Sequence, residues 1–212
     1  MLSRFRRPLP WLGGAAALLT LGVALAATVQ RLDFAGLTHL STHIVAGKVL
    51  SDTPAWTPDG GAVVTLHQMS VATTWKGELQ ASTITVRTPG GRMGDYVMEM
   101  AGAPELKTGD DVLLFLERNE DGSFGVISLA QGSFRVGAAP DGSFVVTRDP
   151  GAAQLVAVDR NGSAKLAAVT ETLVSVRAQV DAALAAERAG LPAEPEIETV
   201  PLHDVAAEGG GR

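Results

Sequence analysis

Three of the four histidines lie close enough in the sequence to suggest a metal site. His39 and His43 are four residues apart, and His67 lies on the next expected strand. Three neutral imidazoles can hold zinc and leave a fourth position open for catalysis. A four-residue spacing brings two ligands to one face only on a helix, however, and His43 begins an expected strand. No H-E-x-x-H motif is present. We therefore expect no metal, and His39, His43 and His67 are only minor candidates.

A second candidate site lies in the long connection from Thr88 to Gly109. Gly90-Gly91-Arg92 could present backbone amides and a guanidinium to an anion. A connection this long is either a binding loop or a hairpin, and Tyr96 to Met100 could form a short edge strand. Because Gly-Gly is first a turn signal, the alternative is a glycine-rich hairpin with a solvated arginine. The candidate binding loop consists of Gly90, Gly91, Arg92, Gly94, Asp95 and Tyr96.

The remaining residue types give little support to catalysis. The absence of cysteine excludes disulfide scaffolds, thiolate zinc sites, cysteine-held iron–sulfur clusters and cysteine nucleophiles. Met93, Met98 and Met100 have neither histidine nor cysteine nearby, so we expect them to fill the edge of a core. No catalytic serine arrangement and no carboxylate pair stands out from the sequence. We therefore expect a non-enzyme that needs no cofactor.

The charge balance bears on the class of partner. The chain has 17 Lys and Arg against 23 Asp and Glu, a net charge of −6, which argues against nucleic-acid binding. With 46% hydrophobic and 19% charged residues, it can bury a core. Its 212 residues indicate one domain with extensions. The expected partner is therefore a protein.

Residues 1–26 have the pattern of an export signal. A charged start at Arg4-Phe5-Arg6-Arg7 precedes an uncharged stretch, and Ala24-Leu25-Ala26 has the small residues of a cleavage site. The alternative is an uncleaved membrane anchor, because the apolar stretch approaches the roughly 17–25 residues that span a bilayer. Either way we expect a periplasmic or extracellular protein that meets a membrane only through this segment. At the other end, residues 190–212 are acidic and rich in proline and glycine, so we expect a disordered tail.

Residues 36–150 have the pattern of a β-barrel domain. Val112–Leu116 is apolar on both faces, which indicates a central buried strand. Thr83–Arg87 alternates, with Ile84 and Val86 expected to point inward. The expected strands are Ile44–Leu50, Ala62–Thr73, Thr83–Arg87 and Val112–Leu116.

Two features of the first strands suggest how the barrel closes. The apolar face of Ala62–Thr73 changes phase midway, which predicts a bulge or sharp bend near His67 and Gln68. Small closed barrels need such bends. The segment from Asp52 to Gly61 is expected to be a loop, with the Trp56 ring covering an edge of the core.

A short repeat follows the central strand. Its copies begin at Asp121, Gln131 and Asp141, and each reads Asp/Gln-Gly-Ser-Phe with a valine two places after the phenylalanine. Asp-Gly favours a tight turn, and ten residues per strand and turn is the spacing of a β-meander. We interpret the repeat as architectural, because no copy has the G-x-S-x-G motif of a nucleophile elbow.

The end of the domain has helical periodicity. One apolar stripe predicts a helix over 167–189, formed by Val169, Leu173, Val176, Val180 and Leu184. Two interpretations remain open, a helix packed across the barrel or a helix that binds a partner. We favour packing, because a lone helix needs tertiary burial to persist.

The order of these short sequence segments resembles that in an exported bacterial family of uncharacterised proteins. The resemblance covers about Leu37 to Val146 and includes the Gly-Gly loop, the Ala103-Pro104 step and the segment Leu129–Gly132. More distantly, the Gly-Lys-Val strand, the Lys-Gly turn and the Gly-acid-x-hydrophobic strand are similar to netrin-like modules. Those are the OB-type barrels of the tissue inhibitors of metalloproteinases.

What the resemblance implies is a fold and a class of partner. It implies an OB-like barrel and makes an exported protease the partner to test. The inhibitors chelate the protease zinc with an N-terminal cysteine and are held by disulfides, and this chain has neither. No inhibitory residue therefore carries over.

Together these observations predict a mainly β protein, a small OB-like or meander β-barrel with a C-terminal α-helix. We expect an exported, non-catalytic protein-binding module. The alternatives are an envelope-associated structural protein and a metal-dependent hydrolase that uses the three histidines.

Overall fold

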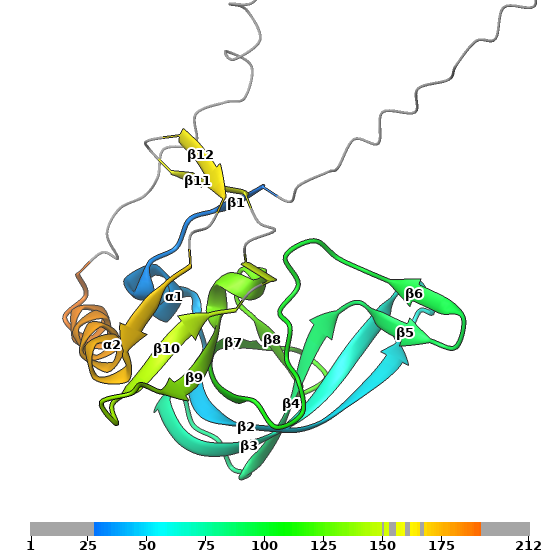
Figure 1. The fold of residues 1–212 in the computed structure, drawn as a ribbon, viewed down its shortest axis with the longest axis horizontal. Coiled ribbons are helices and arrows are strands. Elements are labelled where there is room, and N and C mark those ends of the chain that lie inside the picture. The colour runs from blue at the N-terminus through cyan, green and yellow to red at the C-terminus, as the bar shows by residue number, and fades with distance from the viewer. Residues whose placement is uncertain (1–27, 150, 153–155, 160–161, 166–167, 192–212) are drawn as a thin grey trace, which may run out of the picture.

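The computed structural model describes residues 28–149, 151–152, 156–159, 162–165 and 168–191. The protein is mainly β, with a closed five-stranded barrel and a C-terminal helix, so the expected fold class is confirmed (Figure 1). The expected export signal, 1–26, lies outside the described residues, and so does the expected tail from residue 192 onward. In the described part of the chain, no helix combines the length and the apolarity needed to cross a membrane.

The barrel closes through one parallel strand pair. Hydrogen-bonded neighbours run β7-β2-β3-β4-β8, and β8 pairs again with β7. All these pairs are antiparallel except β4 and β8. Counted along the chain, the barrel order is therefore 1-2-3-5-4-1, a five-stranded Greek-key arrangement of the OB type. The strands are β2 (His43–Trp56), β3 (Val63–Lys76), β4 (Thr83–Pro89), β7 (Asp111–Arg118) and β8 (Phe124–Val126).

The predicted bend is present, but it is made by the neighbouring strand. The register shifts between Val49 and Ser51 of β2, opposite Met69 and Gln68 of β3. The extra residue, Leu50, is thus on β2. The predicted change of phase within β3 is wrong, because a polar residue, His67, occupies the inward position next to Met69, and both are buried.

The predicted loop from Asp52 to Gly61 is also wrong in its first half, because β2 continues to Trp56. Pairing with β3 runs on to the Trp56–Val63 pair, whereas the pairing with β7 ends at Lys48. The outer half of β2 therefore lies at an edge. Proline is tolerated in such a strand, where its missing N–H breaks no ladder bond, and this explains Pro54.

The repeat builds a meander that extends the sheet beyond the barrel. β9 (Ser133–Ala138), β10 (Phe144–Arg148) and β13 (Thr170–Thr172) follow β7 in the order β7-β9-β10-β13. In both Asp-Gly copies the aspartate accepts hydrogen bonds from the serine two residues later, Asp121 from Ser123 and Asp141 from Ser143. The Gln-Gly copy instead ends a short 3₁₀ helix, η1 (Leu129–Gly132), before β9.

Two helices cover the outside of this extended sheet. α1 is Phe34–Leu40 and α2 is Leu173–Arg188. α2 begins later than the predicted residue 167, because Thr170–Thr172 forms strand β13 and pairs with β10. Val176, Val180 and Leu184 of α2 are buried, and they belong to an apolar cluster with Phe115 of β7. The packed-helix interpretation is therefore confirmed.

β7 separates two cores, which explains why its sequence is apolar on both faces. Leu113 and Phe115 pack in the cluster under the helices. Val112, Leu114 and Leu116 pack in a second cluster that fills the barrel. Ile84 and Val86 of β4 point into the barrel as predicted.

Two small sheets lie beside the barrel. β1 (Thr28–Gln30), β11 (Val156–Asp159) and β12 (Gly162–Lys165) form one of them. β5 (Gly91–Met93) and β6 (Tyr96–Met98) form a hairpin on the side of the barrel opposite to α2 (Figure 1).

Candidate functional site

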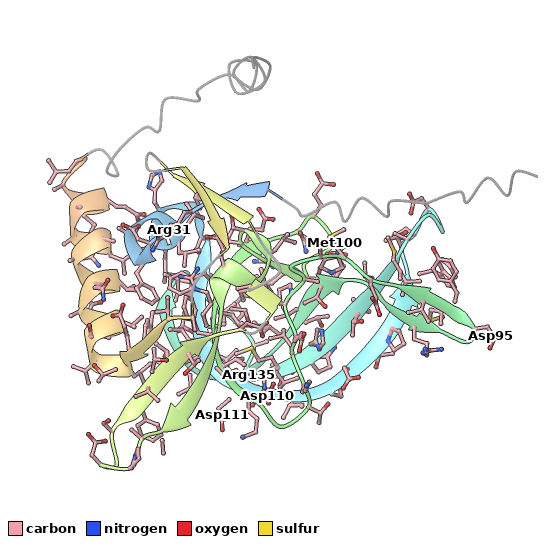
Figure 2. The ribbon with its side chains drawn as sticks, turned by 45° about the horizontal axis from the view of Figure 1, so that its top comes forward. Arg31, Asp95, Met100, Asp110, Asp111 and Arg135 are labelled. Carbon is pink, nitrogen blue, oxygen red and sulfur yellow. The ribbon has the colours of Figure 1, made fainter. Side chains whose placement is uncertain are left out.

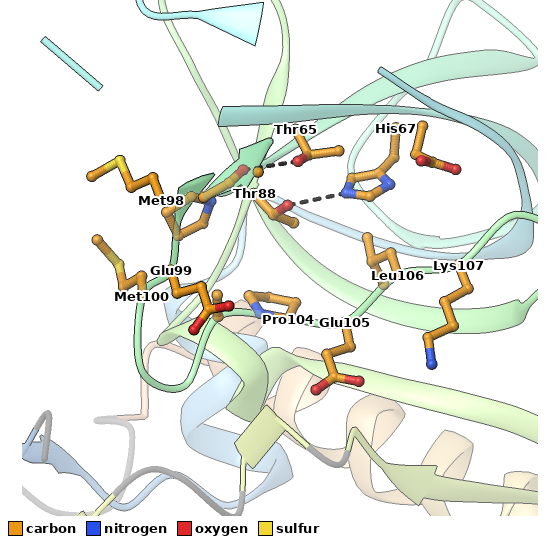
Figure 3. Close-up of a pocket in the computed structure, with 15 residues that line it drawn as sticks. Thr65, His67, Thr88, Met98, Glu99, Met100, Pro104, Glu105, Leu106 and Lys107 are labelled. Carbon is orange, nitrogen blue, oxygen red and sulfur yellow. Dashed lines mark hydrogen bonds between the residues drawn. The ribbon is translucent and has the colours of Figure 1, made fainter. Parts of the chain in front are cut away.

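A cavity of about 520 Å³ opens at the end of the barrel near the β5–β6 hairpin (Figure 3). Inward side chains of β3 and β4 form its floor, and Met98 at the end of β6 together with residues from 99–107 forms one wall. From this wall, Leu106 is 7% exposed and joins the apolar cluster inside the barrel. The cavity therefore lies above a filled barrel, and its volume is in the range of small-ligand sites, ~300–1,000 Å³.

The floor of the cavity is polar. His67 of β3 and Thr88 of β4 are each 3% exposed, and His67 Nε2 lies 3.0 Å from Thr88 Oγ1 (Figure 3). His67 Nδ1 is also buried and has no hydrogen-bond partner. Burial lowers the pKa of His67, and the nearby carboxylate of Asp52 opposes that change. The imidazole is therefore neutral at pH 7, and its buried Nδ1 is left without a hydrogen-bond partner.

His67 and Thr88 lie within hydrogen-bond distance, as a catalytic base and its nucleophile must. Among the residues that the structure describes, however, no third side chain orients the imidazole. Catalytic pairs of this kind need a base that another side chain holds in place. Asp52 accepts a hydrogen bond from Thr108 Oγ1 at 2.7 Å, and it makes no bond to the unpartnered His67 Nδ1. The hydroxyl of Thr88 is also buried. The arrangement is better suited to binding than to nucleophilic catalysis.

The rim of the cavity carries an excess of negative charge. Asp52, Glu99 and Glu105 contribute carboxylates, and Lys107 contributes an ammonium group. All four residues are exposed. Such a rim favours a cationic ligand over an anionic one.

The wall of the cavity is tied to the meander. Asp149, which is 2% exposed, accepts hydrogen bonds from the backbone N–H of Glu105 at 3.3 Å and of Gly151 at 2.8 Å. Burial raises the pKa of this carboxyl, and the two backbone bonds oppose the change. Arg135 donates to the Glu105 carbonyl at 3.1 Å. The backbone of Glu105 in the wall is thus fixed both at its N–H, by Asp149, and at its carbonyl, by Arg135.

The predicted loop is a hairpin, and its glycines are required by the backbone. Gly90 and Gly91 have φ of +92° and +147°. A Cβ on Gly91 would lie 2.8 Å from Thr65 Oγ1, so β5 approaches β3 more closely than another residue allows. Val63 of β3 holds both ends of the β5–β6 hairpin. Its carbonyl accepts a hydrogen bond from Gly90 N–H at 2.9 Å, and its N–H points to Met98 Sδ at 3.3 Å.

The hairpin presents an exposed surface with a large apolar share. The ring of Trp56 at the end of β2 packs at a tilt against the ring of Tyr96, with centroids 5.0 Å apart. These side chains are 43% and 47% exposed, and Val97 is 46% exposed. Arg92 pairs with Val97 across the hairpin and is exposed too, but strand alternation places these two side chains on the face opposite to Tyr96. We call Trp56, Arg92, Tyr96 and Val97, which together cover both faces of the hairpin, the hairpin surface. Trp56 does not cover a core edge, as its sequence position predicted, because β2 carries it past the barrel.

The structure separates the predicted loop residues into two places. Gly90 and Gly91 line the cavity. Arg92 and Tyr96 belong to the hairpin surface, and Asp95 lies at the tip of the hairpin, far from α2 (Figure 2). Gly94 lies in the same turn, with φ of +61°.

The three candidate histidines do not meet. His39 lies on α1, with Nδ1 3.5 Å from Glu187 of α2. His43 is at the start of β2, where its ring packs edge-on against Phe124 of β8. His67 lies in the cavity floor. Over the described part of the chain, no three His, Cys, Asp or Glu side chains gather as metal ligands would.

Sequence reasoning missed the cavity residues Thr88, Glu99 and Glu105. Glu99 and Glu105 lie within the long connection that was singled out, but only the tertiary fold brings them over β3 and β4. A signal was available for His67 and Thr88. Residues two apart on a strand face the same side. His67 is two residues before the inward Met69, and Thr88 is two residues after the inward Val86, so both are expected to face inward.

Comparison with known proteins gives no further identification. No known protein family matches the chain, and no curated protein is similar to it at a significant level.

Proposed function

We propose that this protein is an exported, non-catalytic module that binds a protein partner through the hairpin surface. The observation that carries the proposal is the exposed contact between the tilted rings of Trp56 and Tyr96. Aromatic rings of this size are normally buried, and leaving two of them half-exposed at one hairpin costs solvation free energy that a partner would recover.

The composition of the hairpin surface supports this function. Trp, Tyr and Arg are the residue types that most often dominate the binding energy of protein interfaces. Here Trp56, Arg92 and Tyr96 come from two hairpins that contact each other. Such rings also bury much area at a small cost in conformational entropy.

The hairpin is also suited to binding because it is held in place before a partner arrives. Its two glycines adopt conformations that other residues avoid, and Val63 bonds to both of its ends. A surface that is already ordered loses less conformational entropy on association.

Export and the class of partner are the parts of the proposal that the sequence supports. The leader pattern of residues 1–26 supports a partner outside the cytoplasm, and the netrin-like resemblance makes an exported protease the first one to test. Mass spectrometry of the mature N-terminus tests the localisation. A membrane-bound protein that keeps Met1 would favour the anchor, and a soluble protein that starts near Ala27 would support export with cleavage.

Capture of partners from the exported fraction of the source cells tests the binding function. The wild-type protein is compared with Trp56→Ala, Tyr96→Ala and Arg92→Ala. Phe144→Ala is the matched control, because Phe144 is 59% exposed but lies on β10. We expect the three hairpin variants to lose a protein that the control retains, with unchanged circular dichroism. Equal capture by all four variants would contradict the proposal.

A further inference from the structure

We propose that the barrel-mouth cavity accepts a lysine or arginine side chain of the bound partner, with His67 Nδ1 as the buried acceptor. This inference rests on the proposed function, because it supplies the partner whose side chain enters the cavity. It assigns a charge and a shape to the segment that is recognised.

The first step is the unpartnered nitrogen. A buried polar atom without a hydrogen bond costs free energy, about 1–3 kcal/mol, so such atoms usually have a partner. His67 Nδ1 is buried without a partner in a residue that lines the cavity. When Nε2–H donates to Thr88 Oγ1, Nδ1 is an acceptor, and the ligand must then supply an N–H or O–H donor.

The second step is the sign of the charge. The rim presents the carboxylates of Asp52, Glu99 and Glu105 and one ammonium group, that of Lys107. An anionic group would meet three like charges at the entrance, whereas an ammonium or guanidinium group meets three opposite ones. The donor that reaches His67 is therefore cationic.

The third step is the shape of the passage between rim and floor. Met98 and Met100 lie beside each other at one side of the cavity, and Pro104 and Leu106 face the floor from the wall (Figure 3). A lysine or arginine side chain has an apolar stem that matches such a passage and a charged end that matches the polar groups. A compact ion such as ammonium would leave the apolar wall without contacts.

The fourth step is continuity with the hairpin surface. The backbone of β6 leads directly from Tyr96 and Val97 to Met98 and Glu99 at the cavity. A partner segment that lies along the hairpin therefore passes the cavity mouth. For this reason we assign the cationic group to the partner protein rather than to a free amine.

Nuclear magnetic resonance of the whole protein, labelled at the histidine ring nitrogens, tests the inference. The probe is the peptide acetyl-Gly-Gly-Lys-Gly-Gly-amide. The control peptide carries norleucine in place of lysine, so it has the same stem without the charge. We expect the lysine peptide to shift the His67 signals in a saturable way, at least tenfold more tightly than the norleucine peptide. Free cadaverine is the third arm and reports binding of an amine without a backbone.

Variants of the rim test the charge without risk to the core. Asp52 and Glu99 are exposed. Asp52→Asn and Glu99→Gln should each lower the affinity for the lysine peptide about two- to fivefold, the range for exposed ion pairs. Glu120→Gln, an exposed residue in the turn between β7 and β8, is the matched control and should not change the affinity. His67→Asn should abolish the preference for lysine over norleucine if the variant folds.

The outcomes separate this inference from the proposed function. Equal binding of the lysine and norleucine peptides, or no shift at His67 with the lysine peptide, would overturn the cavity assignment. Cadaverine that binds more tightly than the peptide would overturn the protein source. Each of these results leaves partner capture by the hairpin surface untouched, and that is measured separately with Trp56→Ala.

Discussion

Trp56 stacks on Tyr96 with ring centroids 5.0 Å apart and ring planes inclined by 41°. This contact joins the end of the β2–β3 hairpin to the β5–β6 hairpin, and the two hairpins also meet at Val63, which bonds to Gly90 and Met98. The pair therefore has a role in stability as well as a proposed role in binding.

A double-mutant cycle of Trp56→Ala and Tyr96→Ala should show coupling between the two rings. Aromatic pairs contribute about 0.5–1.5 kcal/mol beyond their buried area, and we expect the low end because both rings are half-exposed. Urea unfolding of wild type, both single variants and the double variant gives this coupling free energy. Additive losses would show that the rings do not stabilise each other.

Gly91→Ala should destabilise the protein by about 1–3 kcal/mol, the cost of strained backbone and a crowded Cβ. Gly91 has φ of +147°, and its Cβ would lie 2.8 Å from Thr65 Oγ1 and 3.1 Å from Val63 Cγ1. Gly137 on β9 is the matched control, because a Cβ there meets nothing within 4 Å. Thermal unfolding should show a lower Tm for Gly91→Ala and little change for Gly137→Ala. Equal Tm values for the two variants would show that the close approach of β5 to β3 does not require glycine at position 91.

The sequence predicts those parts of the fold that depend on local pattern. Val112–Leu116 is identified as central because it is apolar on both faces, and the Asp-Gly turns are found from turn chemistry alone. The outer half of β2 is missed, because Pro54 and the following glycines indicate a loop. Only tertiary pairing shows that this half lies at an edge, where proline does no harm.

The candidate site is predicted in outline but not in detail. The connection from Thr88 to Gly109 is found from its length, and it does border the cavity. The cavity floor is missed because its residues lie on two strands, and sequence spacing cannot show that His67 faces Thr88. Histidine at an inward strand position is easily counted as an interruption of the apolar pattern.

Burial of His67 should make the protein less stable as the pH falls. The pKa of His67 in the folded protein is below its ordinary value of 6.5, because burial disfavours the charged ring. Between pH 6.5 and that lowered pKa, the unfolded chain binds a proton that the folded chain does not. The stability contribution is therefore full above pH 6.5 and is lost as the pH falls through the folded-state pKa.

The variant His67→Gln should remove this part of the pH dependence. Each unit by which the pKa is lowered corresponds to about 1.4 kcal/mol. Urea unfolding at pH 8, 6 and 5 compares the two proteins, and the carboxylates that titrate in both contribute equally. The difference in unfolding free energy between wild type and variant should shrink toward acid pH. A constant difference would mean that His67 is protonated equally in both states.

Glu187→Gln should loosen α2 from the barrel. Lys76 of β3 donates to Glu187 Oε1 at 2.9 Å and to the Thr38 carbonyl at 2.7 Å, so one ammonium group joins β3, α1 and α2. The two charged side chains are only 19% and 28% exposed, which limits screening by water. We expect a loss of about 1–2 kcal/mol, in the range of hydrogen bonds to charged groups.

Asp181→Asn on the same helix is the matched control for that change. Asp181 pairs with Arg177 one turn earlier at 2.8 Å, but both side chains are about half exposed, at 51% and 42%. Such exposed helix pairs are screened by water and contribute little to stability. Hydrogen exchange of the α2 amides should therefore quicken in Glu187→Gln and change little in Asp181→Asn. No increase in Glu187→Gln would show that α2 is held by its apolar stripe alone, and the same increase in both variants would show that the Lys76 pair contributes no more than an exposed ion pair.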